Sequence, residues 1–203
     1  MALDVFPTPD DGSRRSTEHV WDEAARPTGP AVDPGADYSR QGAGVAGHLI
    51  EVHDHLRSEL ERVHDLVAQV RAGRLAAGEA RAAVNELSLR QNDWTLGAYC
   101  ASFCTFVAGH HGLEDQAVFP YLKGADERLA PVIDRLEDEH LVVHDLLVRL
   151  DSALVDVLRE PDGLTRLADT LDVLTDALLS HLSYEERELV EPLARLGFYP
   201  GQV

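Results

Sequence analysis

The stretch FVAGHHGLEDQAVFP, residues 106–120, places two histidines and two carboxylates among Phe, Val, Leu and Ala. Buried imidazoles and carboxylates are costly unless they are paired or coordinate a metal. These four side chains therefore either face water or bind something. The positions of the other histidines along the chain help to distinguish these alternatives.

Composition limits the class of protein. The chain has 203 residues, enough for one domain with a sizeable core and a tail. Its 36 acidic and 18 basic residues give a net charge of −18, which argues against a nucleic-acid or anionic-membrane partner. We see no targeting segment and no run apolar enough to span a bilayer. The two cysteines, Cys100 and Cys104, do not form a disulfide framework, so a cytoplasmic location is expected.

The chain divides into a tail and a helical domain. Residues 1–44 are rich in Pro and Gly and show no apolar periodicity, so we expect a disordered or extended tail with no apolar face to dock on the domain. Residues 45–203 contain four long helical patterns separated by Gly and Pro. They cover about 45–71, 94–122, 126–159 and 164–196. Strand signals are absent. This pattern predicts an all-α fold, an up-down antiparallel four-helix bundle.

Each predicted helix directs at least one histidine toward the core. A helix advances about 100° per residue, so each polar side chain can be placed relative to the apolar stripe of its helix. The side chains within or beside these stripes are His53, His110, Glu114, His140, His144, His181 and Glu185. By the same geometry His111, Asp115 and Glu186 point away from the core.

The agreement between four helices favours a metal site. A single histidine on an apolar face is more often a core residue than a ligand. A bundle that buried five imidazoles and two carboxylates without a metal, however, would carry a large desolvation penalty. Imidazole with carboxylate suits Fe, Mn or Zn. Seven ligands exceed the needs of one ion, whereas two ions bridged by Glu114 and Glu185 would use them all. At about six sites per iron, an additional oxo or hydroxo bridge leaves one open position for a small molecule.

Four segments together resemble the hemerythrin-like, or HHE cation-binding, family: VHDHLR (52–57), HHGLEDQAVFP (110–120), DEHLVVH (138–144) and HLSYEERELVEPL (181–193). The resemblance covers about residues 45–197 and implies an up-down four-helix bundle with a non-haem di-iron centre. Hemerythrins proper carry an aspartate five residues after the last histidine, where this chain has Glu186; the HHE-type spacing favours Glu185. His144 matches a second histidine of the third helix that many HHE proteins lack.

Three functions are compatible with this resemblance. The first is a protein that binds or senses a small diatomic ligand, O2 or NO, at a centre of two iron ions. The second is an enzyme acting on peroxide or NO, or in the repair of iron centres, which would need an external electron donor. The third is iron storage or transfer. A histidine-rich ligand set favours the first, because ferritin-like oxidising sites are rich in carboxylates.

Overall fold

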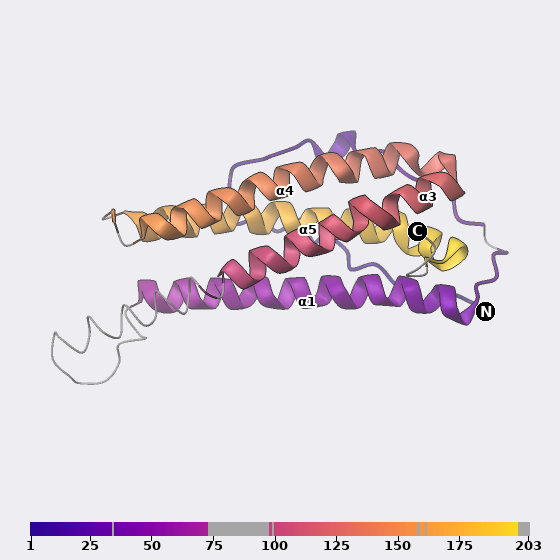
Figure 1. Cartoon of the computed structure of the whole chain (residues 1–203), viewed down its shortest axis with the longest axis horizontal. Helices are drawn as coiled ribbons and strands as arrows, with labels where there is room; N and C mark the ends of the chain where they lie inside the picture. The colour runs from indigo at the N-terminus through magenta and orange to yellow at the C-terminus, as the bar shows by residue number, and fades with distance from the viewer. Residues whose placement is uncertain (34, 73–97, 99, 158, 161, 199–203) are drawn as a thin grey trace.

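The computed structural model describes residues 1–33, 35–72, 98, 100–157, 159–160 and 162–198. Within these ranges every regular element is helical and no strand occurs. Four long helical stretches lie alongside one another as a helical bundle (Figure 1). They are α1 (Arg40–Arg71), a helix at 100–113 that continues through the π-helical turn η3 (Glu114–Val118) into α3 (Phe119–Ala125), α4 (Ala130–Asp156) and α5 (Gly163–Leu196). The short 3-10 turns η1 (Glu23–Ala25) and η4 (Glu127–Leu129) complete the described elements. The start of the predicted second helix, at 94, lies outside the described residues.

Helix α1 begins at Arg40, five residues before the predicted boundary at 45. The Ser39 hydroxyl accepts a hydrogen bond from the Gly42 N–H, the N-cap arrangement that Ser favours. A Cβ at Gly42 would collide with the Ala194 carbonyl, so the absence of a side chain lets α1 approach α5 closely. The helical domain therefore starts inside the predicted tail.

Two apolar clusters divide the core along the length of the bundle. On α1, Leu56 belongs to one cluster and Leu49 to the other, and buried His53 lies between them. The same division recurs on α4, where His140 separates Leu136 from Val143. The buried polar side chains therefore occupy a layer in the middle of the bundle, with apolar packing on both sides.

The N-terminal tail packs against the bundle, so the expectation that it would not dock is wrong. It runs in extended conformation beside the helices (Figure 1). The Asp176 carboxylate on α5 accepts hydrogen bonds from the backbone N–H groups of Arg15 and Ser16 at 2.8–2.9 Å. Further along α5, Glu188 accepts from the Gly29 N–H at 2.7 Å. Backbone donors and a few scattered apolar side chains, among them Val5 and Trp21, hold the tail, which is why apolar periodicity did not reveal the contact.

The tail also changes which side chains of α5 are buried. From Leu178 to Glu186 all but Leu179 are buried, on every side of the helix. A helix that faced solvent on one side would show a polar exposed stripe instead.

None of the described helices is long and apolar enough to cross a membrane.

We predict that Asp176→Ala destabilises the protein, because three hydrogen bonds to a buried carboxylate are lost. Hydrogen bonds to charged groups contribute about 1.5–3 kcal/mol each, and the freed N–H groups regain water, so the expected loss is about 2 kcal/mol. Denaturant unfolding measures it. Asp169→Ala, on the exposed face of the same helix, is the matched control and should change stability by less than about 0.5 kcal/mol. Equal effects at the two positions would contradict the docking of the tail.

Candidate metal centre

Five histidines and two glutamates from all four long helical stretches meet in the polar layer. They form two groups, and within each group the candidate ligand atoms lie within 4.8 Å of one another. One group is His111, His140 and His181; the other is His53, His110, Glu114 and Glu185. Every sequence-predicted ligand except His144 belongs to one of the groups. His144 is exposed, and His111, predicted to point away from the core, is buried.

The two glutamates lie between the groups. Glu114 places Oε1 3.3 Å from His110 Nε2 and Oε2 3.7 Å from His140 Nε2, and these histidines belong to different groups. Glu185 Oε2 lies 3.6 Å from the Nε2 atoms of both His53 and His181, which again belong to different groups. Each carboxylate thus faces both sets of imidazoles, the arrangement required of a ligand that bridges two cations.

The Nε2 atoms of His53 and His110 lie 3.0 Å apart, within hydrogen-bond distance, but most of the other inward-facing atoms lack a hydrogen-bond partner. Among the described residues, five of the six buried side-chain nitrogen and oxygen atoms without a partner belong to this layer. They are His111 Nε2, His140 Nε2, His181 Nε2, Glu114 Oε2 and Glu185 Oε2. Leaving such an atom unsatisfied costs about 1–3 kcal/mol each, and buried polar groups are normally paired. Cations bound among these atoms would satisfy all five, so the residues fit a two-metal site.

Carboxylates accept hydrogen bonds from the Nδ1 atoms of three imidazole rings, on the side of each ring away from Nε2. His53 Nδ1 donates to Glu186 at 2.9 Å, and His140 Nδ1 donates to Asp115 at 2.7 Å. A ring that donates from Nδ1 leaves the Nε2 lone pair free to bind a metal. Both carboxylates were predicted to face away from the core. They face away from the other ligands but contact the rings.

Glu139 holds the ring of His181, and sequence reasoning missed it. His181 Nδ1 donates to Glu139 Oε2 at 3.1 Å. Burial alone would raise the pKa of Glu139, but its hydrogen bonds with His181 and Arg26 lower that pKa to about 2. Glu139 precedes His140 directly and lies at the edge of the apolar stripe of α4. Its sequence position gave no signal that separates it from an ordinary surface glutamate.

Burial and mutual charge shift the pKa values in the layer in opposite directions. Burial, together with the charge of Glu185, holds the pKa of Glu114 well above its usual range. Burial also lowers the pKa of His110 to about 3 and that of His111 well below its usual value. His110 and His111 therefore stay neutral at physiological pH, the state in which imidazoles bind metal ions.

Two large exposed side chains explain the error at His111. Phe106 and Leu113 were counted in the apolar stripe, but they are 41% and 58% exposed. The stripe that is buried runs through Phe103 and Val107, about 50° further round the helix. His110 and His111 therefore flank the inward direction on either side, and both reach the layer. The π-helical turn that begins at Glu114 is typical of functional sites in helices.

On α4 and α5, His144 and Glu186 differ from their predicted environments for other reasons. His144 lies about 100° from the centre of the buried stripe of α4, which Leu136, Val143 and Leu150 define. Glu186 was expected to face solvent, but the tail covers it: the Thr8 N–H donates to Glu186 at 2.7 Å. The helical geometry of α5 was assigned correctly, and the tail supplied the burial.

Comparison with known protein families matches residues 45–193 to the hemerythrin HHE cation binding domain. The chain belongs to the hemerythrin HHE family. No curated protein and no solved structure matches it. The matched range contains all seven side chains of the two groups, so the hemerythrin HHE domain and the polar layer coincide.

An apolar groove reaches the edge of the hemerythrin HHE centre. It has a volume of 760 Å³, and its walls come from α1 and the helix at 100–113. It is lined by Val52, Ala101, Ser102, Thr105, Phe106, Gly109, His110 and Leu113. His110 is thus both a member of the centre and a wall of the groove.

The cysteines take no part in the centre. Cys100 is buried, and burial raises its pKa to about 12 and that of Cys104 to about 11. Thiols with raised pKa values are poor nucleophiles and redox sensors. Both side chains pack in the apolar core instead.

We predict that the metal-free protein loses stability as pH falls from about 6.5. The pKa of His110 is about 3 in the folded protein, below the ordinary histidine value of 6.5, so in this window the unfolded chain binds a proton that the folded chain does not. The stabilisation is present above pH 6.5 and is lost toward pH 3. Unfolding free energies measured between pH 7 and 4 should show a flatter slope in His110→Gln. The exposed His48→Gln on α1 should keep the wild-type slope; equal slopes in all three proteins would refute the shift.

We predict different losses of metal at two neighbouring positions on α5. Glu185→Ala removes the carboxylate that faces both groups, so metal content should fall to one ion or none. Glu186→Ala frees the ring of His53 but leaves both groups intact, and affinity should fall about 10- to 100-fold. Metal analysis with chelator competition measures both effects, and the exposed Glu51→Ala is the control. Complete loss in Glu186→Ala with both ions kept in Glu185→Ala would make Glu186 the direct ligand.

Proposed function

We propose that this protein holds two iron ions in the polar layer and binds or senses a small diatomic ligand, O2 or NO. The proposed metal ligands are His53, His110, His111, Glu114, His140, His181 and Glu185. The observation that carries the proposal is the position of Glu114 and Glu185, each facing imidazoles of both groups and each with a buried oxygen that lacks a partner. Mixed imidazole and carboxylate ligands suit iron.

The protein's own residues define the environment of the bound ions. Two iron ions, oxo- or hydroxo-bridged, would supply one-electron chemistry and an open coordination position. The apolar clusters on both sides keep water from the layer, which strengthens every charge interaction within it. The groove beside His110 is apolar, as an uncharged diatomic ligand requires. We take the bundle as up-down and antiparallel; the short connection at Asp126–Leu129 between α3 and α4 supports this order.

The histidine content favours ligand binding over oxidation of iron for storage. Five imidazoles against two carboxylates make a nitrogen-rich site, whereas ferritin-like bundles pair several glutamates with Glu-x-x-His motifs. Turnover of peroxide or NO would require an external electron donor. We place the protein in the cytoplasm, where its two free cysteines would stay reduced.

We predict about two irons per purified chain, near-ultraviolet bands of an oxo-bridged ferric pair and no haem band. Stopped-flow mixing of the anaerobically reduced protein with O2, NO or peroxide then separates the functions. A reversible spectral change with O2 or NO supports binding or sensing. Catalytic loss of peroxide or NO with an added reductant would identify an enzyme instead, and release of iron to an apo-acceptor would identify a carrier. One zinc ion per chain, or no metal in the folded protein, would overturn the proposal.

A further inference from the structure

The tail contributes a buried arginine to the surroundings of the metal centre. The Arg26 side chain is 6% exposed, and it forms a two-point contact with Glu139: Nε donates to Oε1 at 2.8 Å and Nη2 to Oε2 at 2.9 Å. Glu139 in turn accepts the Nδ1 proton of His181. A continuous chain of charged hydrogen bonds thus runs from the tail through α4 to a proposed metal ligand.

One face of α5 is built to receive the tail. Its polar residues recur every fourth position: Asp176, Ser180, Tyr184 and Glu188. Asp176 and Glu188 accept tail backbone N–H groups, as described above. Ser180 Oγ accepts from Arg26 at 2.9 Å, and the Tyr184 hydroxyl donates to the Pro27 carbonyl at 2.8 Å. The Arg26 guanidinium also lies 4.7 Å from the centre of the Tyr184 ring. The stripe fixes the backbone on both sides of Arg26.

The ligands on α5 directly follow members of this stripe. His181 comes after Ser180, and Glu185 comes after Tyr184, so each ligand is rotated by about 100° from its neighbour on the stripe. The same two turns of α5 therefore contact the tail on one side and the polar layer on the other.

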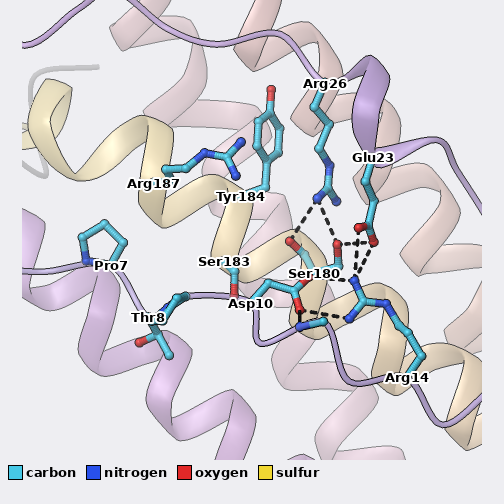
Figure 2. A pocket seen from close by; sticks show the side chains of 12 residues that line it. Pro7, Thr8, Asp10, Arg14, Glu23, Arg26, Ser180, Ser183, Tyr184 and Arg187 are labelled. Atoms are coloured by element: carbon cyan, nitrogen blue, oxygen red, sulfur yellow. Dashed lines mark hydrogen bonds and ion pairs between the residues drawn. The ribbon is translucent and has the colours of Figure 1, made fainter.

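A network of polar contacts connects Arg26 with the surface of the tail (Figure 2). Arg14 pairs with Asp10 and with Glu23, and Glu23 accepts a hydrogen bond from Ser180 Oγ at 2.7 Å. These residues line a cleft of 490 Å³ between the tail and α5. Val20 and Trp21 pack against the apolar core nearby, and at the cleft itself these polar contacts hold the tail.

A second contact of the tail has the same form. The Thr8 N–H donates to Glu186 Oε2, while Glu186 Oε1 accepts the Nδ1 proton of His53. His181 and His53 belong to different ligand groups. The tail therefore reaches both groups, each through one buried carboxylate.

We propose that Arg26 is a positioning residue for the metal centre: by holding Glu139 it fixes the ring of His181, and through it the tail controls how firmly the bundle retains its metal. The part that concerns retention rests on the proposed function. Carboxylates and their partners behind metal-binding histidines commonly change metal affinity by about 10- to 100-fold. Arg135 also contacts Glu139, so removal of Arg26 leaves the carboxylate partly compensated and the fold intact.

The first test measures metal release. In Arg26→Gln, transfer of iron to a chelator should be about 10-fold faster than in wild type, with Arg26→Lys in between because lysine offers a single point of contact. Arg149→Gln is the matched control, since Arg149 pairs with Glu18 of the tail at an exposed site. Release from Arg26→Gln at the rate of the control would overturn the proposal.

A double-mutant cycle shows whether Arg26 acts through Glu139. Introduced into Glu139→Gln, the Arg26→Gln change should accelerate release less than twofold, because the path to His181 is already broken. The same acceleration in both backgrounds would mean that Arg26 acts only by holding the tail, which overturns the positioning role.

The second readout does not need metal. In the metal-free protein labelled with 15N, the Nδ1 proton of His181 should give a protected, downfield resonance that is lost or shifted in Arg26→Gln and retained in Arg149→Gln. An unchanged resonance would overturn the positioning role. If wild type bound no iron pair but showed this dependence, the proposed function would fail while the positioning of His181 by Arg26 would stand.

Discussion

Hydrogen bonds from Nδ1 to the carboxylates of Glu186, Asp115 and Glu139 hold three of the five imidazole rings of the polar layer, and the other features of the site depend on them. They fix the tautomer of each ring, so that Nε2 presents a lone pair toward the centre. The two buried carboxylates among them have partners of their own: Arg26 and Arg135 contact Glu139, and Arg57 contacts Glu186. The need for compensation thus extends outward from the ligands to the surface of the protein.

The inner carboxylates have no such partners. Glu114 and Glu185 are surrounded by imidazoles, and they lie close enough for the charge of Glu185 to raise the pKa of Glu114. A half-satisfied polar network in an apolar interior is worse than an apolar core, because low polarity strengthens repulsion and desolvation alike. Cations bound in the polar layer would compensate the charge of both carboxylates. The apolar clusters on both sides, which make the metal-free layer costly, also make bound cations hold more firmly.

Periodicity predicted long helices in the described parts of the chain and all but one of the side chains that meet in the layer. The prediction assumed that large apolar side chains are buried, and it failed where such side chains are exposed. Phe106 and Leu113 are large, apolar and exposed, and they shifted the predicted stripe away from His111. Helical geometry also placed His144 in the apolar stripe of its helix, and the family resemblance agreed, but this side chain is exposed. Glu139 carries no signal in the sequence, because its role depends on an arginine 113 residues away.

The tail illustrates how an acidic protein satisfies its carboxylates. With 36 acidic and 18 basic residues, the chain has too few cations to pair every carboxylate. Backbone N–H groups are neutral donors, and an extended segment offers them without internal partners. On α5 they contact Asp176, Glu186 and Glu188. A segment without apolar periodicity can therefore dock firmly on an acidic helix. Because one of these carboxylates also holds His53, the docking that satisfies the surface of α5 stabilises the ligand layer beneath it.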